Sequence, residues 1–95
     1  MTDYALGRFA VHVGERFDVA EVPGTTWILV EARGYGEVLD PTTHASFSLL
    51  FRGAPDPVVA QQIVTLRHPA RGDQAIFVTP IGRDADGVTY QAVFN

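Results

Sequence analysis

Apolar and polar residues alternate along much of this chain, and the alternation predicts a series of short β-strands. The pattern is clear in residues 88–94, which are followed by Asn95. Successive side chains of a strand point to opposite faces, so one face of this segment should form a wall of the core. The residues on that face are Val88, Tyr90, Ala92 and Phe94.

Five further segments have strand character, at residues 16–22, 26–33, 45–52, 63–68 and 74–81. The alternation is cleanest in 45–52, where Phe47, Leu49 and Phe51 point one way. Segment 26–33 is apolar on both faces, so it is either covered on both sides or exposes Trp27 to a partner. Turn residues separate the segments at 23–24, 55–57 and 82–87.

Six short strands at regular spacing, with almost no helical pattern, predict an all-β fold. We expect a small antiparallel, partly closed barrel, because closure buries the apolar face of a sheet and shortens its free edges. Thr2 and Asp3 can cap a short N-terminal helical turn that begins at Tyr4 and ends by Gly14. No repeat or linker divides the sequence, so residues 1–95 are predicted to form a single β domain.

The composition is typical of a folded protein, since 46% of the 95 residues are hydrophobic and 19% are charged. The chain has no cysteine, which removes disulfides, thiol catalysis and cysteine-based zinc sites. The formal charge of −4 and the scattered arginines argue against nucleic-acid binding, which needs clustered cations. No segment approaches the roughly 20 apolar residues needed to cross a bilayer, and no signal peptide is recognisable. We therefore expect no nucleic-acid or membrane partner, and a location in the cytoplasm or in an assembly exported without a signal peptide.

The sequence contains no recognisable set of metal ligands. Asp84, Asp86 and Gly87 resemble part of a calcium loop, but in that register Val93 takes the place of the terminal glutamate. A hairpin turn is the favoured interpretation, because Asp and Gly are typical turn residues. The histidines lie in three separate segments without a His-x-x-x-His or His–Glu pairing, whereas zinc needs three or four converging ligands. These residues are His12, His44 and His68, and we expect neither a metal nor another cofactor.

Signatures of catalysis are also missing from the sequence. No serine stands in a Gly-x-Ser-x-Gly elbow, and no glycine-rich turn opens a helix to hold phosphate. Arg52 ends the cleanest strand beside the proline-rich loop at 55–57, where Asp56 is a candidate salt-bridge partner. Arg52 therefore either pins its own loop or is presented to a protein partner.

Three motifs, in this order, resemble a family of short uncharacterised bacterial domains with the pattern FSLxFRG…HPxxG…DGxxYxAVFN. They are FSLLFRG at 47–53, His68-Pro69 with Gly72, and DGVTYQAVFN at 86–95. The resemblance covers nearly the whole chain and implies no particular activity. Because members of that family are often encoded near fibre proteins of the phage tail-collar type, it implies an accessory role in a tail-like or surface assembly.

The first functional hypothesis is a non-enzymatic β-domain that binds a protein partner or itself, within a phage-tail-like or surface fibre system. Its candidate interface residues are Trp27, Arg52, His68 and Tyr90. The alternative is a small-molecule-binding β-barrel in which Trp27 or Tyr90 lines a pocket. A concave apolar pocket would favour the ligand, whereas a flat exposed patch that includes Trp27 would favour the partner.

Overall fold

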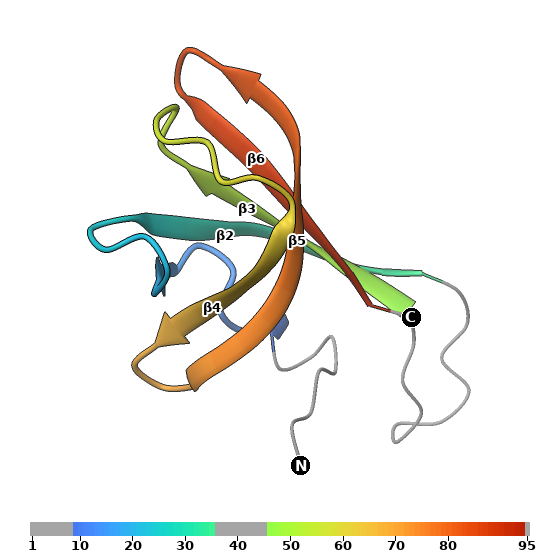
Figure 1. The fold of residues 1–95 in the computed structure, drawn as a ribbon. Helices are drawn as coiled ribbons and strands as arrows, with labels where there is room; N and C mark the ends of the chain where they lie inside the picture. The colour runs from blue at the N-terminus through green and yellow to red at the C-terminus, as the bar shows by residue number, and fades with distance from the viewer. Residues whose placement is uncertain (1–8, 36–45, 95) are drawn as a thin grey trace, which may run out of the picture.

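The computed structural model describes residues 9–35 and 46–94, which form six antiparallel strands closed into a barrel (Figure 1). The prediction of an all-β antiparallel barrel is confirmed, and the barrel is fully rather than partly closed. Among the described residues, no helix has the length and apolar character required to span a membrane. The strands are β1 (Arg16–Val19), β2 (Thr26–Tyr35), β3 (Ser46–Gly53), β4 (Gln62–His68), β5 (Gly72–Asp84) and β6 (Gly87–Phe94).

The strands follow a Greek-key order around the barrel, β1-β2-β3-β6-β5-β4. The first three strands are consecutive neighbours, and the connection after β3 then crosses the barrel so that β4 pairs with β1. β6 closes the barrel by pairing with β3 along most of its length. β5 is long and bent, because its first part pairs with β4 and its last part with β6 (Figure 1).

The predicted inward faces of β3 and β6 are buried, although Phe94 is only partly so. Ser48, on the opposite face of β3, is buried as well. At the centre of the core, the rings of Trp27 and Tyr90 stack with their centroids 4.0 Å apart and their planes 15° from parallel. Trp27 reaches Tyr90 across Gly53 of β3, where an added Cβ would lie only 2.5 Å from Trp27 Cδ1. The missing side chain of Gly53 is therefore the space in which the indole ring sits.

Tyr90 also holds the crossing connection between β3 and β4 against the barrel. Its hydroxyl oxygen accepts a hydrogen bond from the backbone N–H of Val59 over 2.9 Å, and both residues are buried. A buried N–H without a partner would be costly, so this bond satisfies the connection at the point where it enters the core.

The N-terminal residues that the structure describes close one end of the barrel. Most of the predicted helical turn lies outside the described residues, but 9–14 form a turn in which the His12 N–H donates to the Phe9 carbonyl. Phe9 is fully buried, and its ring lies 6.2 Å from that of Phe47 and 6.0 Å from that of Phe94. Gly14 has a φ of +92°, a conformation that favours glycine, and there the chain turns into β1.

Gly53→Ala should lower the free energy of unfolding by about 1–3 kcal/mol, because the new methyl group overpacks a site occupied by a buried indole ring. Gly82→Ala is the matched control, since Gly82 has open space around its Cβ position and no positive φ. The control should change stability by at most about 0.5 kcal/mol. Urea denaturation measures both variants, and an equal cost in the two would contradict the packing of Trp27 on Gly53.

Candidate functional site

Two of the four predicted interface residues, Trp27 and Tyr90, belong to the core. Both are buried and stacked on each other, so neither has the exposed surface that a partner contact requires. The same stack leaves no space for a ligand between the two rings. The interior at this point is packed by side chains.

Arg52 pins a loop, but not the one predicted. Its guanidinium donates to Thr89 Oγ1 over 2.9 Å and to Asp84 Oδ1 over 2.5 Å. Asp56 is instead bound by Arg83 at 3.2 Å, so the prediction of an Arg52–Asp56 pair is wrong. The physical reason is that the β5–β6 hairpin folds back beside the end of β3, which brings Asp84 to Arg52.

Residues 84–87 form the hairpin turn that was predicted there. Asp84 Oδ1 accepts the backbone N–H groups of Asp86 and Gly87 at 2.9 and 3.1 Å, in addition to its bond with Arg52. These contacts lower the pKa of the Asp84 carboxyl, through the Asp86 N–H first and then through Arg52. In this arrangement Asp84 holds the turn together.

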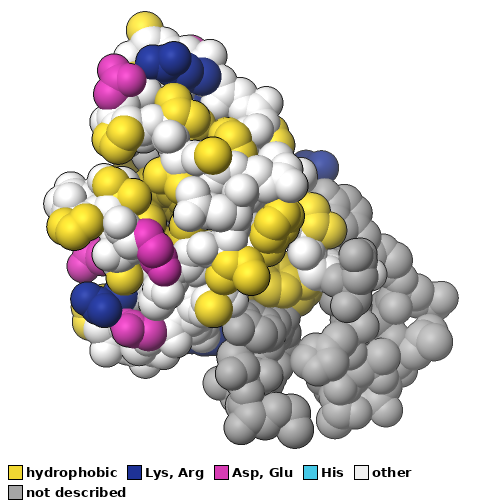
Figure 2. All heavy atoms as spheres, in the orientation of Figure 1, with side chains coloured by type: hydrophobic (Ala, Val, Ile, Leu, Met, Phe, Trp, Pro, Cys, Tyr) yellow, Lys and Arg dark blue, Asp and Glu magenta, His cyan; other side chains and the backbone are white. Residues whose placement is uncertain are grey.

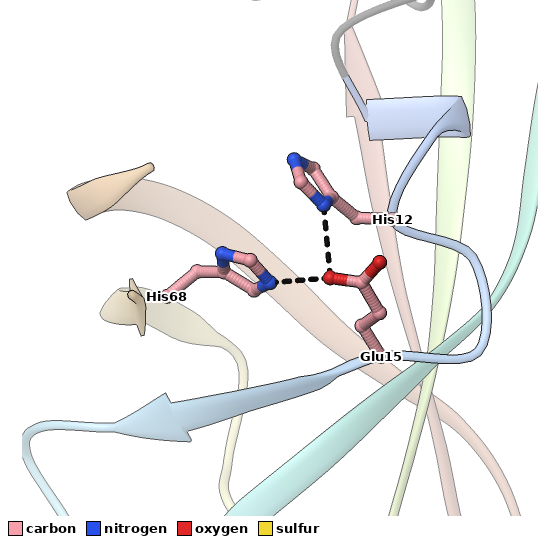
Figure 3. Close-up of side chains that lie close together, drawn as sticks. All are labelled: His12, Glu15 and His68. Atoms are coloured by element: carbon pink, nitrogen blue, oxygen red, sulfur yellow. Dashed lines mark hydrogen bonds and ion pairs between the residues drawn. The ribbon is translucent and has the colours of Figure 1, made fainter. Parts of the chain in front are cut away.

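His68 belongs to a cluster with His12 and Glu15 (Figure 3). His12 lies in the N-terminal turn, Glu15 immediately precedes β1, and His68 is the last residue of β4. β1 pairs with β4, and this pairing brings the three side chains together. The expectation that the histidines stay apart is therefore wrong for His12 and His68, while His44 lies outside the described residues.

One carboxylate oxygen of Glu15 connects the two histidines of the cluster. Glu15 Oε1 lies 2.6 Å from His68 Nε2 and 3.0 Å from His12 Nδ1, and the two imidazole centroids are 4.4 Å apart. The side chains of His68 and His12 are 8% and 13% exposed, whereas that of Glu15 is 47% exposed. The cluster is therefore walled by the two rings and opens to solvent at the carboxylate.

The hydrogen bonds also determine where the protons are. The backbone N–H of Ala70 donates to His68 Nδ1 over 3.0 Å, so this nitrogen is unprotonated and the ring proton is on Nε2, facing Glu15. His12 Nδ1 also faces the carboxylate, which can only accept, and therefore donates to it. The pKa of the Glu15 carboxyl lies below its ordinary value because His68, and then His12, donate hydrogen bonds to its charged form.

The cluster has the chemistry of a metal site as well as that of a hydrogen-bonded network. Its three donor atoms, two imidazole nitrogens and one carboxylate oxygen, lie within 4.8 Å of one another. These are ligand types that zinc accepts. In the part of the chain that the structure describes, this is the one group of three or more potential ligands that comes together.

A second feature is a surface hollow of about 360 Å³ beside the turn between β1 and β2. Asp18, Thr26 and Arg67 are among the residues that line it. Asp18 accepts a hydrogen bond from the Thr26 hydroxyl, and Asp73 binds the Arg67 guanidinium through two contacts at 2.8 and 3.1 Å. The side chains of Asp18, Thr26 and Arg67 thus already have partners within the protein.

The sequence pattern did not predict the cluster, because two of its members are three residues apart in a turn and the third is far from them along the chain. The signal was His12-x-x-Glu15 with Gly14 between them, which places two ligand types around a tight turn. His68 lies 53 residues beyond Glu15, and only the neighbouring positions of β1 and β4 connect them.

Fold and site together define a small, six-stranded Greek-key β-barrel domain with a His–Glu–His cluster at one end. The chain belongs to the family described as Domain of unknown function (DUF6916), whose model matches residues 4–94. No curated protein and no solved structure matched the chain.

Asp84→Asn should lower the melting temperature at pH 7, because the carboxylate binds Arg52 and the turn N–H groups more strongly than an amide does. The pKa of Asp84 is lowered in the folded state, so its contribution is fully present above a pH of about 4 and is lost as the pH falls through the folded-state pKa. The difference between wild type and variant should therefore vanish in strong acid.

The matched control is Asp86→Asn in the same turn, since it is the backbone N–H of Asp86 that engages Asp84. Melting curves of the three proteins between pH 7 and strong acid measure the effect. A stability gap for Asp84→Asn that is the same at every pH, or equal to that of Asp86→Asn, would contradict the assignment.

Proposed function

We propose that this domain is a non-enzymatic interaction module that binds a protein partner through the outer face of β4, β5 and β6. The observation that carries the proposal is a group of large, exposed apolar side chains on three neighbouring strands, directed away from the core. We call this group the outer patch. It consists of Ile63, Phe77, Ile81 and Val93.

About half or more of the surface of each residue in the outer patch is exposed to solvent. Ile63 and Phe77 pair across β4 and β5, and they are 63% and 52% exposed. Ile81, farther along β5, is 52% exposed, and Val93 on β6 is 56% exposed. Single exposed apolar residues are ordinary, but several on adjacent strands are typical of a surface that another protein covers.

Charged residues lie near the two ends of this face, away from the apolar side chains of the outer patch. Asp73 and Arg83 lie near the two ends of β5, and they pair with Arg67 and Asp56, respectively. Figure 2 shows hydrophobic side chains across the middle of this view, with charged ones at its top and along its left side. An apolar centre with a polar rim is the usual anatomy of a protein interface.

The resemblance noted in the sequence gives this proposal its finer form. We propose that the partner is a fibre-type protein of a phage-tail-like or surface assembly, with self-association of the domain as the alternative. The support for this form is the genomic association that the resemblance implies, which is an association and not a mechanism. A small-molecule role is the second candidate, and the polar hollow beside Arg67 is the feature that favours it.

Phe77→Asp should weaken binding to the partner, or self-association, at least tenfold, because it places a charge in the centre of the outer patch. Val30→Asp is the matched control, since Val30 is 46% exposed and lies on β2, which neighbours none of the patch strands. Size-exclusion chromatography with light scattering, on the chain alone and with the products of adjacent genes, measures both forms of the proposal.

Two outcomes would contradict the proposal. One is a wild-type chain that stays monomeric and binds none of the neighbouring gene products. The other is an assembly that Val30→Asp disrupts while Phe77→Asp, folded as judged by its melting curve, leaves it intact.

A further inference from the structure

We propose that His12, Glu15 and His68 bind one divalent transition-metal ion, with zinc as the expected occupant. Imidazole nitrogen and carboxylate oxygen are ligands of zinc, and two histidines with one glutamate are a known three-ligand set. The partial exposure of Glu15 leaves a fourth position accessible to water. The proposal concerns the end of the barrel near Phe9 and is independent of the outer patch.

The first support is the convergence of the donor atoms. His68 Nε2 and His12 Nδ1 point at the same carboxylate oxygen, at 2.6 and 3.0 Å (Figure 3). Around a tetrahedral zinc ion, with bonds of about 2.0–2.1 Å, neighbouring ligand atoms lie about 3.3 Å apart. The two distances to Glu15 Oε1 therefore need to open by several tenths of an ångström, and the separation of the two imidazole nitrogens, which is at most 4.8 Å, must reach a similar value. The half-exposed Glu15 can accommodate these shifts.

The second support is that each ligand is held by a different part of the fold. His12 is fixed by the turn that follows Phe9, and Glu15 is fixed by backbone bonds to His12 and to Leu29 of β2. His68 is packed against Phe17, with ring centroids 4.9 Å apart. Ligands held in place before binding lose less freedom when the ion arrives.

The hydrogen bond between the Ala70 N–H and His68 Nδ1 competes with metal binding, and its loss would be a measurable sign that the ion is bound. Each histidine can ligate only when the proton that faces Glu15 moves to its other ring nitrogen. In His12 this proton moves from Nδ1 to Nε2. In His68 it moves from Nε2 to Nδ1, which now accepts the Ala70 N–H. Ala70 is exposed in the turn between β4 and β5, so its N–H can turn to water. Losing one such bond changes an equilibrium constant by about tenfold, which is small beside the affinity of a three-ligand zinc site. Metal binding should therefore break the Ala70 bond.

The test is isothermal titration of the untagged full chain with zinc chloride. The expected result is one ion bound per chain, together with a rise in melting temperature, because the site exists only in the folded state. Magnesium should not bind, since it prefers all-oxygen ligands. His12→Gln, Glu15→Gln and His68→Gln should each weaken zinc binding by at least about tenfold.

Glu31→Gln is the matched control for Glu15→Gln, because Glu31 lies on β2 and pairs with Arg33 rather than with the cluster. The zinc affinity of this variant should equal that of the wild type. If His68→Gln does not fold, the more exposed His12→Gln and Glu15→Gln decide the result. Amide exchange of Ala70 provides an independent measurement, and it should become faster when zinc is added.

Absence of zinc binding would overturn the proposal, as would an affinity that falls in Glu31→Gln but not in His12→Gln or Glu15→Gln. Zinc binding that leaves Ala70 exchange unchanged would overturn the assignment of His68 as a ligand. Phe77→Asp should bind zinc as the wild type does, so failure of the metal site and failure of the outer patch are separately observable.

Discussion

The stack of Trp27 on Tyr90 is the interaction on which the rest of this barrel depends. A chain of 95 residues without disulfides must derive its stability from packing, and these are two of its largest fully buried side chains. The stack forms because Gly53, on the strand between them, offers no side chain. The Tyr90 hydroxyl then extends the core to Val59, and so holds the connection that completes the Greek key. The same two rings therefore contribute to the core and to the attachment of the connection between β3 and β4.

Outside the packed core around Trp27 and Tyr90, the described part of the barrel carries several surface features. The two rings contact each other at 4.0 Å, which removes the space that a ligand would need between them. The described surface has an apolar patch on β4, β5 and β6, a polar cluster where β1 meets the end of β4, and a polar hollow beside Arg67. The first has the anatomy of a protein interface and the second has that of a metal site. They involve different residues, so one can be altered without the other.

The sequence predicted those parts of the fold that depend on local alternation. The inward faces of β3 and β6 followed from a strict period of two, and the turn at 84–87 followed from its Asp and Gly residues. Trp27 remained ambiguous because β2 is apolar on both faces, and only the closed barrel shows which face is covered. The partner of Arg52 and the meeting of His12 with His68 depend on which strands are neighbours. Alternation along one strand contains no information about that order, so neither contact was predictable.

The central claim is that Trp27 is enclosed within a packed barrel rather than presented at a surface. Trp27 is the only tryptophan, so intrinsic fluorescence reports on it alone. The most direct measurement is acrylamide quenching of this fluorescence in the folded protein and in urea. The structure predicts blue-shifted emission that resists quenching until the protein unfolds. Emission in the folded state that matches that of a solvated indole, and is quenched as readily as in urea, would contradict the account.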